Sequence, residues 1–260
     1  MSHFNQNMEP PKEPILAVLR EPMNPFERVI NIFHAPTSAF RDVKRSSNWW
    51  LPIILLAIFG YGLFFAIHTQ IGWRNVVDNQ MKVASAAQVE QLDKLAPEAR
   101  DKKLNFAANV TMCIYLLMPL MTAAGFLFFG LLYWATLNFI FGASAKYGQV
   151  VSVIAFASLP MLIKFALGVL AIYSNPNPES FSLSNFAPTN VAFAMNAEET
   201  PKALYAMLSA LDAITIWSTF LTGLGLSVVC GVKKSVGQIT AWAWFAIVTL
   251  LVVATAAIRG

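Results

Sequence analysis

Long apolar segments limit what this chain can fold into more than any other feature. The stretch WWLPIILLAIFGYGLFFAIH, residues 49–68, carries no Asp, Glu, Lys or Arg. About 20 apolar residues are what a helix needs to cross the hydrocarbon core of a bilayer. Only 12% of the chain is charged and 57% is hydrophobic, whereas roughly 25% charge is usual in a soluble domain. The sequence therefore predicts an all-α, polytopic membrane protein.

Apolar segments of this length recur along the chain and predict five transmembrane helices. The second lies in an uncharged stretch, residues 105–145, that is longer than a bilayer requires. We expect its helix to bend near Pro119 and to project beyond the membrane. An odd number of spans places the two chain ends on opposite sides. The expected spans are about 49–68, 116–139, 150–173, 208–232 and 239–258, with outer loops at 71–106 and 174–207.

Basic residues near the span ends predict the orientation. Short cytoplasmic loops are enriched in Lys and Arg, and loop 174–207 has three acidic residues against one lysine. Loop 71–106 is discordant, with six basic and five acidic residues, but the charge rule weakens for longer loops. We therefore expect a cytoplasmic N-terminus and an outward C-terminus. The basic residues on the expected inner side are Arg41, Lys44, Arg45, Lys146, Lys233 and Lys234.

The region before the first span predicts a flexible tail, residues 1–23, followed by two short amphipathic helices in residues 24–48. Asn24 can cap the first of these helices and Pro25 suits its first position, while Pro36 separates it from the second. Two arrangements fit: the helices lie on the cytoplasmic leaflet, or they pack on the membrane bundle. The apolar positions are Phe26, Val29, Ile30 and Phe33 in the first helix and Ala39, Phe40 and Val43 in the second.

Motifs of catalysis and metal binding are missing from the sequence. It contains no phosphate-binding glycine loop, nucleophile elbow or histidine pair at metal-ligand spacing. Cys113 and Cys230 fall in apolar runs at opposite membrane faces, so we expect no disulfide between them. The basic residues are scattered and form no stripe for nucleic acid. We expect a non-enzymatic protein without catalytic residues, metal ligands or cofactors.

Lys164 is the exception within ASLPMLIKFALGVLAIY, residues 157–173 of the third span. A cation in a bilayer costs on the order of 3 kcal/mol on insertion scales, so it needs partners. Small residues let helices approach closely, and we expect this face to meet a neighbouring helix. Because Pro160 has no N–H, the Phe156 carbonyl is expected to be free. The residues on the lysine face are Ala157, Pro160, Gly168 and Ala171.

Asp212 is the only other charged residue within the five expected spans. The two side chains should tilt in opposite directions along the membrane normal, which works against a direct bond. Direct pairing, bridging by water or hydroxyls, and separate roles all stay open, as do a structural role and an ion or substrate site. Asp212, Thr215, Thr219 and Thr222 form a polar stripe at helical spacing, and Thr219, Gly223, Ser227 and Gly231 form a close-packing ridge.

Several segments together resemble the bacterial branch of the Yip family. They are HAPTSAF followed by basic residues and WWLP, APEARDKKL, ASLPMLIK, and ALDAITIWSTFLTGLGLSVVCGVKK. The resemblance covers about residues 24–258. It implies a five-span protein of the bacterial plasma (inner) membrane with a cytoplasmic N-terminus and an outward C-terminus. Eukaryotic relatives interact with Ypt/Rab GTPases and act in membrane traffic without known catalytic chemistry.

Two functions follow as hypotheses. The first is a non-enzymatic protein that organises membrane, lipid or a partner protein. Its expected partners are the lipid bilayer and either a second copy or another membrane protein, but not nucleic acid. The second is a small transporter or channel that uses Lys164 and Asp212 within the membrane.

Overall fold

The computed structural model describes residues 21–174 and 176–259, and most of the expected tail at 1–23 lies outside them. These residues form helices joined by turns and loops, with no strand in the described part. The helices are α2 (Pro25–His34), α3 (Pro36–Arg45), α4 (Trp50–Ala66), α5 (Trp73–Lys82), α6 (Ala86–Asp93), α7 (Pro97–Leu116), α8 (Met118–Ala135), α9 (Tyr147–Ala157), α10 (Met161–Ser174), α11 (Lys202–Ala210), α12 (Ala213–Cys230) and α13 (Lys234–Arg259). Wide turns η1 (Ile67–Ile71) and η2 (Thr136–Ile140) extend α4 and α8, and η3 (Val191–Ala194) is a short 3-10 helix.

Five helical segments of the described chain are long and apolar enough to cross a membrane. The prediction of an all-α protein with five membrane-spanning helices is confirmed, and the amphipathic helices α2 and α3 precede the first span. Many large apolar side chains on the outside of these segments are exposed, as lipid-facing residues must be. The segments are Trp50–Ile71, Met118–Ile140, Tyr147–Ser174, Ala213–Cys230 and Lys234–Ile258.

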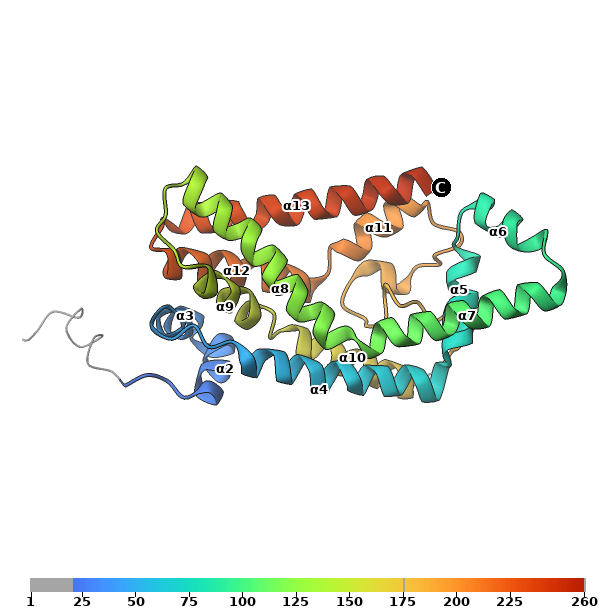
Figure 1. Ribbon diagram of the computed structural model, residues 1–260, viewed down its shortest axis with the longest axis horizontal. Coiled ribbons are helices and arrows are strands. Elements are labelled where there is room, and N and C mark those ends of the chain that lie inside the picture. The colour runs from blue at the N-terminus through green and yellow to red at the C-terminus, as the bar shows by residue number, and fades with distance from the viewer. Residues whose placement is uncertain (1–20, 175, 260) are drawn as a thin grey trace, which may run out of the picture.

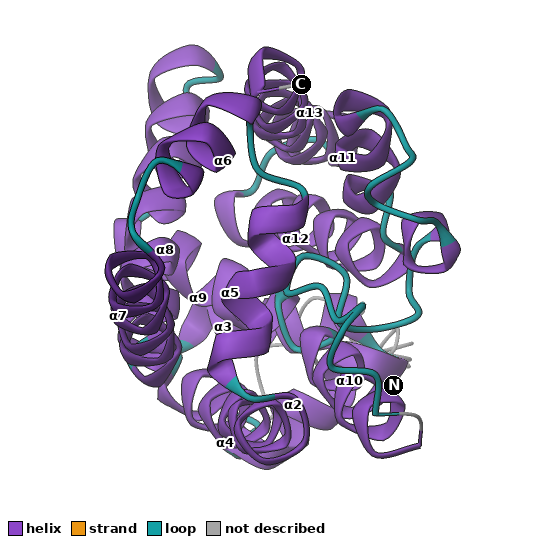
Figure 2. Ribbon diagram, turned by 90° about the vertical axis from the view of Figure 1, so that its right-hand side faces the viewer, coloured by secondary structure: helices purple, strands orange, loops and turns teal. Residues whose placement is uncertain are grey.

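The spans run along the longest axis of the molecule (Figure 1). Helices α2 and α3 lie at one end, together with the turns that join α8 to α9 and α12 to α13; we call this the α2–α3 end. Helices α5, α6 and α7 and the C-terminus lie at the other end, called here the C-terminal end. Figure 2 looks onto the C-terminal end, where the long loop after α10 fills space beside α5 and α10.

The third crossing is interrupted in its middle. Helix α9 ends at Ala157, and α10 begins at Met161 after a turn that contains Pro160. The expectation of a free Phe156 carbonyl is wrong, because this carbonyl accepts a hydrogen bond from the Leu159 N–H at 3.2 Å. The turn therefore satisfies a backbone group that the proline would otherwise leave without a donor.

The fourth crossing also differs from the sequence-based expectation. A single span from about residue 208 was expected, but α11 ends at Ala210 and α12 begins at Ala213. Asp212 lies between the two helices in an extended conformation (φ −91°, ψ 127°), so it is a helix cap and not a residue within a helix. Helix α11 packs mainly against α13 and turns away from the axis of α12 (Figure 1).

Helices α12 and α13 pack closely through small residues. A Cβ atom on Gly237 would lie 2.4 Å from the Gly223 carbonyl oxygen and 2.6 Å from Ser227 Oγ. The ridge prediction is wrong for Gly231, which ends α12 in the left-handed region with φ 69°. Glycine suits that position because it has no Cβ to clash there.

Helices α2 and α3 pack on the bundle, which was one of the two arrangements expected. Phe40 and Val43 of α3 are 0% exposed. The Phe40 ring sits so close to α12 that a Cβ on Gly225 would lie 2.8 Å from it. On α2, the Phe33 ring meets the edge of Trp217 with centroids 5.7 Å apart. These contacts make α2 and α3 part of the bundle, and we refer to them together as the α2–α3 unit.

We predict that Gly237→Ala destabilises the protein by about 1–3 kcal/mol, the usual cost of overpacking a tight interface. The added Cβ would collide with backbone, which cannot move aside as a flexible side chain can. Thermal unfolding in detergent, followed by circular dichroism, measures the effect. Gly62→Ala on α4 is the matched control because no atom lies within 4 Å of its added Cβ. Equal losses in the two variants would contradict the packing interpretation.

Candidate functional site

Lys164 and Asp212 form a buried ion pair in the interior of the bundle. The Lys164 Nζ lies 2.9 Å from Asp212 Oδ2, and the two residues are 8% and 1% exposed. Lys164 is in the first turn of α10, ten residues before Ser174 at its end. At a rise of 1.5 Å per residue this distance is about 15 Å, or half the thickness of a hydrocarbon core of ~30 Å. The pair therefore lies deep relative to the C-terminal end.

The position of Asp212 before α12 explains how the two side chains meet despite the expected opposing tilts. Because Asp212 is the N-cap and lies outside the helix, its side chain does not have to tilt in the direction preferred by helical residues. Its Oδ1 accepts hydrogen bonds from the backbone N–H groups of Ile214 at 3.1 Å and Thr215 at 3.0 Å. The Thr215 hydroxyl donates to the same oxygen at 3.2 Å. The carboxylate thus caps α12 through Oδ1 and pairs with the lysine through Oδ2.

The loop after α10 supplies two further donors to this carboxylate. The Thr189 hydroxyl donates to Asp212 Oδ2, and Asn190 Nδ2 donates to the same oxygen at 3.3 Å. The Ala213 N–H in turn donates to the Thr189 carbonyl at 2.9 Å. The sequence analysis missed Thr189 and Asn190, because residues of an irregular loop have no periodicity to place them. One signal for a helix start at Asp212 was present in the sequence, since Asp is among the residues preferred at an N-cap.

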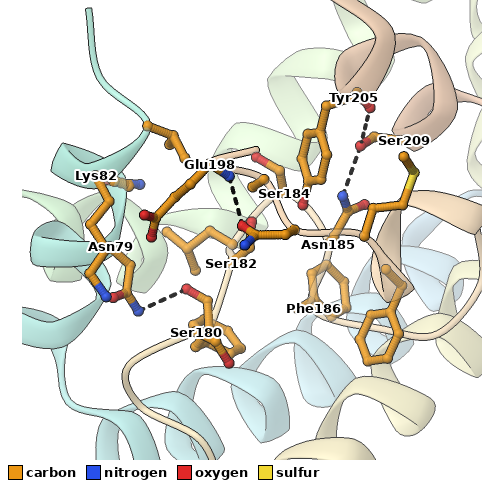
Figure 3. A pocket seen from close by; sticks show the side chains of 18 of the residues that line it. Asn79, Lys82, Ser180, Ser182, Ser184, Asn185, Phe186, Glu198, Tyr205 and Ser209 are labelled. Atoms are coloured by element: carbon orange, nitrogen blue, oxygen red, sulfur yellow. Dashed lines mark hydrogen bonds between the residues drawn. The ribbon is translucent and has the colours of Figure 1, made fainter. Parts of the chain in front are cut away.

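A chain of hydrogen bonds leads from the pair toward the C-terminal end. Asn190 donates to Asn185 Oδ1 at 2.9 Å, and Asn185 donates to Ser209 Oγ at 2.8 Å. Asn185 and Ser209 line a cavity of about 1180 Å³ between α5, the loop after α10, α11 and α13. Figure 3 shows Asn185, Ser209 and Tyr205 together on one side of this cavity. The ion pair is thereby connected to the cavity wall by side-chain amides.

The expectation that the small-residue face around Lys164 meets a neighbouring helix was wrong for Gly168, which meets the loop after α10. A Cβ on Gly168 would lie 2.5 Å from the Phe186 ring. The same ring lies 5.5 Å from Lys164 Nζ, in cation–π geometry, and stacks on Phe165 at 6.1 Å. Pro160 is buried one turn before Lys164 and ends the preceding turn. Gly168 is small because the loop closes over α10 at this point.

The polar stripe of α12 does not extend the site. Thr219 and Thr222 each donate to the backbone carbonyl four residues earlier, at 2.8 Å in both cases. Ser227 does the same to Gly223 at 2.6 Å, within the α12–α13 contact. The proton of each of these hydroxyls is bonded within its own helix, whereas the Thr215 hydroxyl of the same stripe donates to Asp212.

A second buried ion pair, which the sequence analysis missed, fixes the α2–α3 unit. Arg28 Nε donates to Asp42 Oδ2 at 2.9 Å, and the two residues are 3% and 5% exposed. The Arg28 guanidinium also lies 5.5 Å from the centroid of the Phe156 ring on α9. It donates to the Ser46 carbonyl at 3.2 Å. The signal in the sequence was an arginine among the apolar positions of α2, but nothing in the pattern pointed to Asp42.

Groups for acid–base or metal chemistry do not gather in the described part of the chain. It holds no cluster of three or more His, Cys, Asp or Glu side chains that could bind a metal. Cys113 and Cys230 are both free thiols in the structure. The described residues around Lys164 and Asp212 hold two charges inside the protein. The other side chains that contact the carboxylate are the hydroxyls of Thr189 and Thr215 and the amide of Asn190.

The fold and the site define an all-helical integral membrane protein with five spans, in which an interior ion pair joins segments distant in the sequence. A family model, the Yip1 domain, matches residues 30–256. The chain therefore belongs to the Yip family, as its sequence segments predicted, and the match covers the first four spans completely and the fifth, Lys234–Ile258, up to residue 256. No match was found among curated proteins or among solved structures.

We predict that Lys164→Met and Asp212→Asn both destabilise the protein, and that Asp212→Asn costs more. Removing one member of a buried pair typically costs about 3–5 kcal/mol. After Lys164→Met the carboxylate keeps donors from Ile214, Thr215, Thr189 and Asn190. After Asp212→Asn the ammonium loses the carboxylate, so a buried cation remains without its counter-charge.

Thermal unfolding of the two variants and of the double variant measures this coupling in a double-mutant cycle. The control cycle is Lys94→Met, Glu90→Gln and their double variant, because Lys94 pairs with Glu90 at 2.7 Å on the surface, with side chains 71% and 66% exposed. Exposed pairs contribute only about 0–1 kcal/mol. A Lys164–Asp212 coupling as small as that of the surface pair would contradict a structural role for the buried one.

Proposed function

We propose that this chain is a non-enzymatic Yip-type membrane protein that organises the bilayer around it through the α2–α3 unit. The observation that carries the proposal is a helix that is fixed to the bundle on one face and presents two large apolar side chains, flanked by the exposed Glu27 and His34, on the other. Phe26 and Ile30, one turn apart on α2, are 63% and 59% exposed. Arg28 and Ile32, on the opposite side, are buried. Such a helix can insert shallowly among lipids while the bundle holds its position.

Charge around the α2–α3 unit supports contact with a membrane surface. The basic residues near the span ends lie at this end of the molecule and are exposed. Anionic headgroups of the inner leaflet attract such residues by about 1 kcal/mol each. We propose on this basis that the α2–α3 end faces the cytoplasm of a bacterium, that the protein resides in its plasma membrane, and that the C-terminus lies outside. The residues are Arg41, Lys44, Arg45, Lys146, Lys233 and Lys234.

The rigidity of the unit matters for this function. A flexible amphipathic helix would change its depth freely, whereas α2 is joined to α3 by the Arg28–Asp42 pair and α3 is anchored under α12 by Phe40. Any force between α2 and the lipids is then transmitted to the spans. We infer that the unit displaces lipids in one leaflet only, which favours curvature around the protein.

Replacement of the exposed apolar pair tests the proposal. We predict that Phe26→Ser/Ile30→Ser folds normally but no longer reduces the diameter of reconstituted vesicles, as measured by electron cryomicroscopy. Each substitution removes an apolar side chain whose burial in lipid contributes about 1.5–3 kcal/mol to the free energy of insertion. The matched control is Phe106→Ser/Val110→Ser on α7, where the two side chains have the same spacing and are 69% and 40% exposed. Unchanged vesicle shape with the wild-type protein, or equal effects of both double variants, would contradict the proposal.

A small transporter is the second candidate, and one observation favours it. The third and fourth crossings are both interrupted beside the Lys164–Asp212 pair, and interrupted helices surround ion sites in many transporters. The two candidates differ in what they require of Lys164. A transporter would lose flux when this residue is replaced, whereas the organising function needs only that the bundle stays folded.

We predict no Lys164-dependent proton flux, because the carboxylate is already surrounded by donors and both charges are satisfied. Proteoliposomes that enclose a pH-sensitive dye measure the flux for the wild-type protein and for Lys164→Met at a temperature where both are folded. Lys94→Met serves as the control for the removal of a lysine. Flux that is present in the wild type and control but lost in Lys164→Met would establish the transporter instead.

A further inference from the structure

A cavity among the described residues lies at the C-terminal end and is separate from the α2–α3 unit. Its volume is about 1180 Å³, and pockets of ≈ 300–1,000 Å³ are already large enough for drug-sized ligands. Figure 3 shows Lys82 and Asn79 of α5 on one side of it and Asn185, Tyr205 and Ser209 on another. Neither the ion pair nor the proposed function uses this space.

The floor of the cavity is apolar and belongs to the membrane spans. Ile71 ends the first span, Ile172 lies in the last turn of α10, and Val252 and Ala256 lie in the last two turns of α13. Helix α13 packs mainly on α12 and α11, and its side chains at 252 and 256 face the cavity. These floor residues therefore lie near the ends of segments that are long and apolar enough to cross a membrane.

The walls carry polar side chains and are balanced in charge. Along the loop after α10, Ser180, Ser182 and Ser184 alternate with Phe181 and Leu183, and the charged lining residues are two lysines and two glutamates. Lys82 reaches from α5 and donates to the Glu179 carbonyl at 2.6 Å. A lysine ammonium has three donors, so this contact positions it and leaves capacity for a ligand. Glu198 reaches into the cavity from the loop, in the same part of the space as Lys82 (Figure 3).

Helix α5 holds the loop that forms this wall. Asn79 Nδ2 donates to the carbonyls of Pro178 and Phe181, at 2.6 Å and 3.1 Å. At the other side, Asn185 is 5% exposed and is held by Ser209 and Asn190. The cavity is thus bounded by fixed side chains on both walls, as a preformed ligand site requires.

We propose that this cavity binds one zwitterionic glycerophospholipid, with its phosphate at Lys82, its ammonium at Glu198 and its acyl chains against the floor. A cation and an anion in one polar wall match a headgroup that carries both charges. An anionic headgroup would be repelled by Glu198, and an apolar lipid without a headgroup would leave the wall unmatched. The apolar floor at the membrane boundary selects a lipid over a water-soluble zwitterion.

Native mass spectrometry of the full chain in detergent tests the proposal. Phosphatidylethanolamine is titrated against phosphatidylglycerol and diacylglycerol with the same acyl chains. We expect one phosphatidylethanolamine per chain, bound about tenfold more tightly than either competitor, as one charge-assisted contact provides. Lys82→Met/Glu198→Gln should remove this preference. The matched control is Lys94→Met/Glu90→Gln, which deletes one cation and one anion from an ion pair on α6.

Ala256→Phe is a second variant, which keeps both charges and fills part of the apolar floor of the cavity. It should lower the binding of phosphatidylethanolamine, and it tests the proposal even if the charge variant fails to fold. Equal binding of phosphatidylglycerol, equal loss in the α6 control, or unchanged binding in Ala256→Phe would overturn the proposal. Full competition by glycerophosphoethanolamine would also overturn it, because the ligand would then be a soluble headgroup. None of these outcomes bears on the α2–α3 unit, whose function is tested by vesicle shape.

Discussion

The carboxylate of Asp212 is the interaction on which the interior of this protein depends. It accepts backbone donors at the start of α12, two donors from the loop after α10 and the ammonium of Lys164. Three segments that are distant in the sequence thereby meet at one group. Burying a carboxylate costs several kcal/mol unless its lone pairs are filled and its charge is matched. The loop and both helices must therefore be in place together.

This requirement explains the interruptions in the third and fourth crossings. A continuous fourth helix would bury Asp212 within a turn, where its side chain would follow the helical direction and meet no backbone donor. Ending α11 at Ala210 frees the N–H groups of the next helix for the carboxylate. The turn at Pro160 likewise allows α10 to start at Met161, so that Lys164 falls in its first turn beside Asp212.

The sequence predicted the parts of the fold that depend on composition and length. Apolar runs are long enough to mark five spans, and Asn24 with Pro25 marks the start of α2 correctly. For Lys164 it named Asp212 as a candidate partner and left direct contact open, and the structure has that contact. It did not predict the Thr189 and Asn190 donors, because they belong to an irregular loop, or the Arg28–Asp42 contact, because it joins two helices without a shared repeat. Glycines were ambiguous for a similar reason: Gly223 packs on α13, whereas Gly168 packs on a loop and Gly231 ends a helix.

The two buried ion pairs occupy different halves of the molecule and have different consequences for function. The Arg28–Asp42 pair joins helices of the α2–α3 unit and leaves their outer face apolar, so it couples a surface to the bundle. The Lys164–Asp212 pair exposes no apolar surface of this kind. The two charges neutralise each other, and Asp212 also accepts hydrogen bonds from the first turn of α12 and from the loop after α10. An ion site must exchange its occupant with solvent, whereas this carboxylate would have to give up several donors at once to do so. This geometry favours the interpretation of the pair as a junction that holds the spans in register.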